Sequence, residues 1–131
     1  MKLARPLAVA ISLLFAAASI PSSHAAPSIA DLTKDRATAA EKVYRTSLAL
    51  YQNGLATVDA IYTWSTRWLD AELAAAPKNT KQALADHLKR MQDLDAEAQK
   101  LFATGRARSI DTASAAYFRI EAELWSARAK R

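Results

Sequence analysis

The sequence predicts an all-α protein in which two antiparallel α-hairpins form a four-helix bundle or a coiled-coil-like module. Three observations lead to this prediction. Beyond residue 27, apolar residues recur at spacings of three and four, and no segment shows the strict alternation of a half-buried strand. Alanine is abundant and runs of β-branched residues are missing, which favours helices with closely approaching backbones. Proline and glycine lie outside the periodic segments, where they end or separate helices.

Residues 1–25 have the pattern of a secretory signal peptide. Lys2 and Arg5 form a basic start, residues 7–20 are almost wholly apolar, and a polar stretch ends at Ala25. Cleavage is expected after Ala25, with Ala26 as the second choice. An uncleaved membrane anchor is the less favoured alternative, because the apolar run is shorter than the ~20 residues that a spanning helix needs. Residues 26–131 then form one small helical domain in the periplasm or outside the cell, without a membrane span.

Composition excludes several kinds of site from this domain. The sequence has no cysteine, and His24 lies in the signal segment, so His87 is the only histidine that remains. Cysteine nucleophiles, cysteine-containing zinc sites and sites that need two histidines are therefore excluded. The excess of 18 basic over 13 acidic residues falls by two once Lys2 and Arg5 are removed. We therefore expect no nucleic-acid partner.

The first hairpin is predicted over residues 28–76. Its first helix spans 28–52, where Ser28 and Asp31 form a pattern close to a capping box. Its second helix begins near residue 58, after Thr57 as N-cap. The positions expected to face or border the core are Leu32, Ala40, Val43, Tyr44, Ser47, Leu48, Leu50 and Tyr51 in the first helix, and Val58, Ile61, Ser65, Trp68, Leu69 and Leu73 in the second.

The second hairpin is predicted over residues 79–128, after a linker at 74–81 that contains Pro77. Asn79 and Gln82 offer a capping box for the third helix, and Ser109 is the expected N-cap of the fourth. The predicted core face consists of Leu84, Leu88, Met91, Leu94, Ala98 and Leu101 in the third helix, and of Ile110, Ala113, Tyr117, Ile120, Leu124 and Trp125 in the fourth.

Gly54 and Gly105, the only glycines, mark the two turns between paired helices. Each follows an apolar–aromatic pair and precedes a hydroxyl residue with an aspartate two positions later, at Asp59 and Asp111. A glycine in the left-handed conformation ends a helix, and an aspartate in the first turn suits the positive end of the next one. A nearly constant offset relates the two turns, which suggests that the two halves are copies.

The stretch from Tyr51 to Ile61, followed by Trp68-Leu69-Asp70-Ala71-Glu72-Leu73, is similar to the hairpin of TolC-type outer-membrane efflux proteins. In that family the Gly-Leu turn forms the periplasmic tip of a long α-hairpin, which occurs twice per chain and meets the adaptor protein of the pump. The resemblance implies that Gly54, Leu55 and Asp59 occupy tip positions. Gly105 and Asp111 would be their counterparts in the second repeat, where Arg106 replaces the apolar tip residue.

Trp64 and Trp68 are one helical turn apart and have Arg67 between them. They are either core residues or a stripe that binds a partner, because tryptophan and arginine are favoured at interface hot spots. His87 and Met91, also one turn apart, have a spacing that could hold a soft metal such as copper. The simpler interpretation is a boundary histidine beside a core methionine.

Two glutamates, Glu72 and Glu123, are the nearest approach to a catalytic carboxylate pair. The neighbouring Arg67 and Arg119 favour ordinary ion pairs on the helix surface instead.

Together these features predict an exported, non-enzymatic helical module that binds an envelope protein, and the resemblance implies an efflux adaptor as that protein. The predicted partner-binding residues are Gly54, Leu55, Asp59, Trp64 and Trp68. No catalytic residue, metal or cofactor is predicted, and the oligomeric state is left open. The alternative is a small periplasmic metal-binding or stress-response protein that uses His87 and Met91. An enzyme is ranked last, because no nucleophile–base or metal constellation can be assembled.

Overall fold

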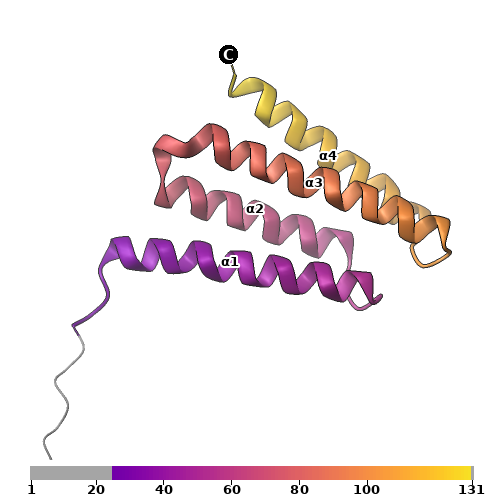
Figure 1. The fold of residues 1–131 in the computed structure, drawn as a ribbon, viewed down its shortest axis with the longest axis horizontal. Coiled ribbons are helices and arrows are strands. Elements are labelled where there is room, and N and C mark those ends of the chain that lie inside the picture. The colour runs from indigo at the N-terminus through magenta and orange to yellow at the C-terminus, as the bar shows by residue number, and fades with distance from the viewer. Residues whose placement is uncertain (1–24, 131) are drawn as a thin grey trace, which may run out of the picture.

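The computed structural model describes residues 25–130 as a set of α-helices (Figure 1). These are α1 (Ile29–Gln52), α2 (Val58–Ala75), α3 (Thr80–Ala103) and α4 (Ser109–Arg128), with a short 3-10 helix, η1 (Pro77–Asn79), between α2 and α3. The described residues contain no strand, so the all-α class is confirmed. None of these helices is long and apolar enough to cross a membrane. The predicted signal peptide lies outside the described residues, apart from Ala25.

Each helix packs mainly against its neighbour in the chain. α1 lies along α2, α3 lies along α4, and a smaller contact between α2 and α3 joins the two pairs. α2 also touches α4. Figure 1 shows α1 and α4 at opposite edges of the molecule. Each of these outer helices therefore has one face toward the rest of the fold and another toward solvent.

The core is a continuous apolar cluster to which all four α-helices contribute. The predicted face of the third helix is largely confirmed, because Met91, Leu94, Ala98 and Leu101 are buried in α3. Tyr62 of α2 stacks on Phe118 of α4 with ring centroids 4.0 Å apart. The buried members of the cluster are Tyr44, Tyr51, Val58, Ile61, Met91, Leu94, Ala98, Leu101, Ala115, Phe118 and Ala122.

Two of the predicted helix starts are confirmed. The Ser28 hydroxyl accepts a hydrogen bond from the Asp31 backbone N–H at 3.1 Å, and the Asp31 carboxylate accepts one from the Ser28 N–H at 3.3 Å. These two bonds form a capping box at the start of α1. The Thr57 hydroxyl accepts from the Ala60 N–H at 3.2 Å and so caps α2.

The predicted capping box of the third helix is wrong. The Asn79 side chain makes no capping hydrogen bond, and the Gln82 side chain instead donates to the Asp86 carboxylate at 2.8 Å. The reason is η1, which carries the chain into α3 already coiled, so that Asn79 is not in the extended conformation of a capping residue. The Thr80 hydroxyl donates to the Pro77 carbonyl at this point.

The predicted core face of the fourth helix is also wrong. Ile110, Tyr117, Ile120 and Leu124 are 47–61% exposed, and Ala113 is exposed as well. The buried residues of α4 are Asp111, Ala115, Phe118, Ala122 and Ser126. α4 carries apolar side chains on two faces, and the face with smaller residues allows a closer approach to α3 and α2.

A smaller error of the same kind affects α1. Leu32 and Leu50 are 52% and 41% exposed, although both were expected at the core. The buried residues of α1 are all among the predicted positions and recur at helical spacing: Ala40, Tyr44, Ser47 and Tyr51.

Candidate functional site

The two glycine turns lie at the same end of the molecule and are built alike. Gly54 and Gly105 have φ angles of 74° and 72°, as the sequence predicts for residues that end helices. In the first turn the Leu55 N–H donates to the Leu50 carbonyl at 2.8 Å, and the Arg106 N–H makes the equivalent bond at 2.7 Å in the second. This is the Schellman motif, in which a left-handed residue closes the helix.

Arg106 connects the two turns. Its guanidinium donates to the Gln52 carbonyl oxygen, at the end of α1, with a distance of 2.5 Å. This cation therefore satisfies a carbonyl that the end of the helix leaves free. The two turns also share a cleft lined by Tyr51, Gly54, Ala56, Thr57, Arg106, Ala107, Arg108 and Asp111.

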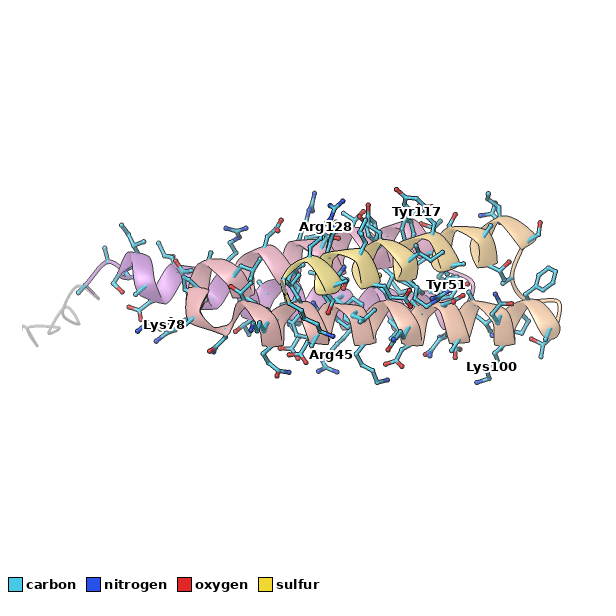
Figure 2. The ribbon with its side chains drawn as sticks, turned by 90° about the horizontal axis from the view of Figure 1, so that it is seen from above. Arg45, Tyr51, Lys78, Lys100, Tyr117 and Arg128 are labelled. Carbon is cyan, nitrogen blue, oxygen red and sulfur yellow. The ribbon has the colours of Figure 1, made fainter. Side chains whose placement is uncertain are left out.

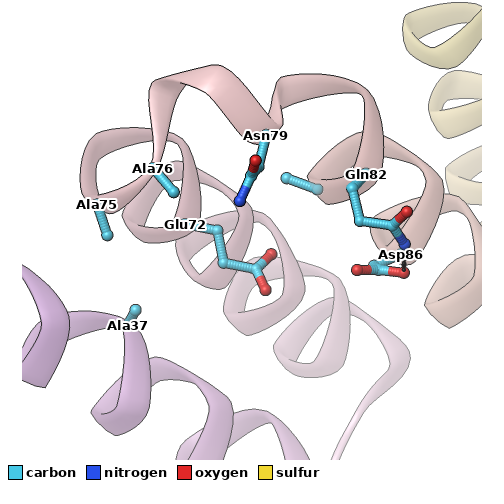
Figure 3. Close-up of a pocket in the computed structure, with 8 residues that line it drawn as sticks. Ala37, Glu72, Ala75, Ala76, Asn79, Gln82 and Asp86 are labelled. Carbon is cyan, nitrogen blue, oxygen red and sulfur yellow. Dashed lines mark hydrogen bonds between the residues drawn. The ribbon is translucent and has the colours of Figure 1, made fainter.

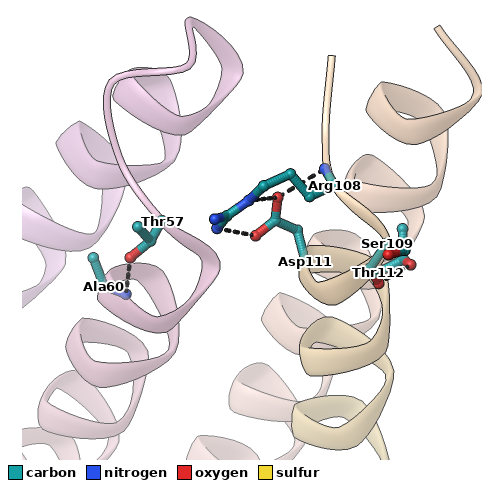
Figure 4. Close-up of polar contacts among 6 residues, drawn as sticks. All are labelled: Thr57, Ala60, Arg108, Ser109, Asp111 and Thr112. Carbon is teal, nitrogen blue, oxygen red and sulfur yellow. Dashed lines mark hydrogen bonds and ion pairs between the residues drawn. The ribbon is translucent and has the colours of Figure 1, made fainter. Parts of the chain in front are cut away.

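The start of α4 differs from the prediction, because Arg108 rather than Ser109 is the N-cap. The Asp111 carboxylate accepts from the Arg108 backbone N–H at 2.9 Å and from its guanidinium at 2.9 and 3.2 Å (Figure 4). The hydrogen bonds from Arg108 lower the pKa of Asp111, although its burial acts in the opposite direction. A carboxylate that reaches back from the first turn thus takes the place of the expected hydroxyl cap, while Asp59 occupies the equivalent turn of α2.

Large apolar side chains are exposed near the two glycine turns. Leu55 is 74% exposed, and Leu50 and Phe102, in the last turns of α1 and α3, are 41% and 48% exposed. We call these three residues, together with Asp59 and Arg106, the tip surface. The expectation that Leu55 lies at an exposed turn is met by this geometry.

The two predicted tryptophans have different surroundings from the tip surface and from each other. Trp68 is half-buried, with the Arg90 guanidinium 4.0 Å from its ring centroid and the Tyr44 ring 5.6 Å away. Trp64 lines a pocket against α1, and Arg67 lies 4.6 Å from its ring centroid. The five predicted partner-binding residues therefore do not form one continuous site.

α2 and α3 enclose a polar cluster that no spacing within one helix predicts. Ser65 and His87 are 0% and 1% exposed. The Ser65 hydroxyl accepts from Arg90 Nε at 2.8 Å and lies 2.9 Å from His87 Nδ1. Arg90 can only donate, so Ser65 Oγ accepts in that contact; its hydrogen and its second lone pair can serve either tautomer of His87 at Nδ1, and the other ring nitrogen is Nε2. That Nε2 is buried without a hydrogen-bond partner, and Trp125 stacks on the ring with centroids 5.5 Å apart.

The charges in this cluster perturb one another. Burial, followed by the charge of Arg90, lowers the pKa of His87 to about 4. Burial raises the pKa of Glu72, and the Arg90 guanidinium, 3.7 Å from its carboxylate, partly offsets that effect. Glu72 thus pairs with Arg90 rather than with the predicted Arg67.

The other predicted ion pair is present in the structure. Arg119 contacts Glu123 at 2.6 Å on α4, and it also contacts Asp95 of α3 at 2.8 Å. The second contact ties α4 to α3.

The predicted boundary position of His87 is wrong, because the ring is enclosed between α2, α3 and α4. The sequence signal that could have revealed this is its spacing, since His87 shares a face with the core residues Met91, Leu94 and Ala98. A polar residue on that face needs a partner, and Ser65 on the core face of α2 is the small hydroxyl that supplies it.

The buried cluster offers no accessible reactive group. Ser65 is fully enclosed, and its hydroxyl is held between Arg90 and His87, so it cannot meet a substrate. Met91 and His87 are 0% and 1% exposed, so neither side chain reaches the surface. Residues 25–130 also contain no group of three or more His, Cys, Asp or Glu side chains able to hold a metal ion.

A pocket lies at the end opposite the glycine turns, between α1, α2 and the start of α3 (Figure 3). Four alanines form its apolar wall, and Glu72, Asn79, Gln82 and Asp86 supply its polar groups. Gln82 and Asp86 bond to each other, so part of that polarity is already satisfied.

Comparison of the chain with protein-family models, with curated proteins and with solved structures gives no match.

Proposed function

We propose that the protein is an exported, non-enzymatic helical module that binds an envelope protein through the tip surface. The observation that supports this proposal is the 74% exposure of Leu55 at the apex of a tight turn. In a Schellman motif an apolar residue after the glycine often packs on the last turn of the helix, but most of the Leu55 side chain remains in water. Large apolar residues grouped at a surface are typical of docking sites.

The surroundings of Leu55 fit the usual anatomy of an interface. Leu50 and Phe102 extend the apolar area from the ends of α1 and α3, while Asp59 and Arg106 provide charged groups beside it. An apolar centre with a polar rim allows a partner to desolvate the centre and to keep the charges at the edge. A partner with a narrow apolar groove and polar edges has the matching chemistry.

The resemblance to TolC-type hairpins suggests the class of partner. In this proposal the two helix pairs act as two hairpins of one coiled-coil-like four-helix module, and the end with both glycine turns meets an efflux adaptor. The protein would then be an accessory of an envelope transport system, without a cofactor.

Leu55→Asp tests the proposal, with Leu32→Asp as a matched control. Leu32 is also an exposed leucine, at 52%, but it lies in the first turn of α1, far from the glycine turns. A photo-reactive residue placed at position 55 in the exported protein should cross-link to an envelope protein, and one at position 32 should not. Co-purification with the protein identified in this way should fall at least tenfold for Leu55→Asp and remain unchanged for Leu32→Asp.

Melting temperatures of both variants distinguish lost binding from lost folding, and both should stay close to that of the original protein. Arg106→Asp should weaken binding less than Leu55→Asp, because Arg106 is already engaged with Gln52. A folded Leu55→Asp protein that retains full binding would refute the tip surface as the site.

A further inference from the structure

α4 has a second apolar face that no described helix covers. Tyr117 is 61% exposed, and Figure 2 shows it projecting from α4 to the outside of the molecule. The residues of this face recur at alternating spacings of three and four, which is the heptad pattern of a coiled-coil seam. We call them the α4 stripe: Ile110, Ala113, Tyr117, Ile120, Leu124 and Ala127, all of which are exposed.

This arrangement is unusual for a surface helix. The opposite face of α4 already packs on the fold through Ala115, Phe118 and Ala122. A helix at the surface of a protein normally places polar residues on its solvent side, so that its apolar residues form a single stripe. The second stripe therefore adds nothing to the fold of one chain, and its exposure calls for a partner.

We propose that the α4 stripe is a dimer interface, in which α4 pairs antiparallel with α4 of a second copy of this chain. The order of large and small residues in the stripe supports this partner. In an antiparallel seam that is centred between Tyr117 and Ile120, every alanine meets a large residue, as close packing requires. The facing pairs are Ile110 with the partner's Ala127, Ala113 with the partner's Leu124, and Tyr117 with the partner's Ile120.

A parallel pairing of the same stripes is less favourable. Identical residues would then face each other, so that Ala113 and Ala127 would each meet another alanine and leave gaps in the seam. The antiparallel arrangement also sets the positive end of each helix beside the negative end of the other.

The glutamates beside the stripe do not oppose the antiparallel arrangement. Glu121 and Glu123 border the stripe, and they would face the partner's Ser114 and Ala116, so the two glutamate pairs do not oppose each other.

The size of the interface sets its strength. A 20-residue helix is ~30 Å long and ~10 Å wide, so one helix pair buries less than the ~800 Å² per partner of a standard interface. The dimer should therefore be reversible and should dissociate on dilution through the micromolar range.

Sedimentation equilibrium of the protein as recovered from cells tests the proposal over that concentration range. We expect a monomer–dimer equilibrium, a shift of at least tenfold toward monomer for Ile120→Asp, and no shift for Leu32→Asp, which also places a charge at an exposed apolar position. Circular dichroism confirms that each variant is folded. A protein that is monomeric at all concentrations, or an unaffected Ile120→Asp dimer, would overturn the proposal.

Cysteine cross-linking tests the orientation without disturbing the centre of the seam, and the absence of native cysteine makes it unambiguous. Ala113→Cys and Leu124→Cys proteins should form a disulfide when they are mixed, because these positions face each other in the antiparallel seam. Disulfides within each protein alone, in place of the mixed product, would show a parallel dimer and refute the antiparallel arrangement. A larger hetero-complex without self-association would assign the stripe to a different partner and would equally refute it.

Discussion

The buried His87 should make the stability of the protein depend on pH in a defined direction. The folded state holds the pKa of His87 at about 4, whereas the ordinary value is 6.5. Between these values the unfolded chain binds a proton that the folded chain resists, so the free energy of unfolding falls as the pH decreases from about 6.5 toward about 4. With these two values, the loss between pH 7 and pH 5 amounts to about 2 kcal/mol.

The measurement is urea denaturation at pH 7 and pH 5 for the original protein and for His87→Gln. Glutamine can accept from or donate to Ser65 Oγ through its amide group, but it does not titrate. The pKa of Glu72 is raised in the folded state, so its contribution to stability is lost as the pH rises through that pKa. This pH dependence has the opposite sign to that of His87 and is present in both proteins. The difference between the two proteins therefore isolates His87. Equal changes in the free energy of unfolding for both would refute the buried, neutral state of the ring.

Three further predictions follow from the turns and the core. Gly54→Val should lower the free energy of unfolding by about 1–2 kcal/mol, and Gly54→Asn should lower it by less. A Cβ at this position meets no neighbour, so only the positive φ is unfavourable, and asparagine tolerates that conformation better than valine. Equal losses for the two variants in chemical denaturation would contradict this reasoning. Met91→Ala should cost ~2–5 kcal/mol, since the side chain is fully buried, and a loss below that range would show that the core collapses around the site. Asp111→Ala should lower the free energy of unfolding by about 0.5–2 kcal/mol, because it removes the carboxylate that caps α4. Asp59→Ala should lower it by less, because Asp59 is exposed and Thr57 provides the cap of α2; thermal denaturation of the two variants compares them.

Helix boundaries were predictable from the sequence, because the chemistry that sets them is local. Gly54 and Gly105 adopt the left-handed conformation that the sequence requires, and Ser28 and Thr57 cap the helices that follow them. The errors arose where two local solutions compete. At Arg108 a carboxylate from the next turn replaced the hydroxyl cap, and at Asn79 a 3-10 turn removed the need for a cap.

The choice of core face was not predictable in α4, because it depends on packing between helices. Periodicity locates two stripes on this helix, and the more apolar one is exposed. The buried stripe contains Ala115 and Ala122 around Phe118, and its small residues permit the close contact with α3 and α2. Hydrophobicity alone ranks the stripes in the opposite order.

The buried polar cluster shows the same limit in a different form. Ser65 was placed on the core face and His87 at its boundary, but their mutual hydrogen bond depends on the register between α2 and α3. Arg90 completes the cluster from α3 and reaches Trp68 and Glu72 on α2. No spacing within a single helix specifies such a contact between helices.

The orientation of the proposed dimer determines how the tip surface would act. Both glycine turns lie at one end of each chain, and α4 begins at that end. An antiparallel α4 seam therefore places the two tip surfaces at opposite ends of the dimer, separated by at least the ~30 Å length of α4. Two such surfaces cannot enter one groove together, but they can engage two partners, so binding of each should be independent unless the partners are themselves linked. A parallel dimer would bring both tip surfaces to the same end, where a single partner could hold them jointly. The cross-linking pattern of positions 113 and 124 therefore also decides whether partner binding should show avidity.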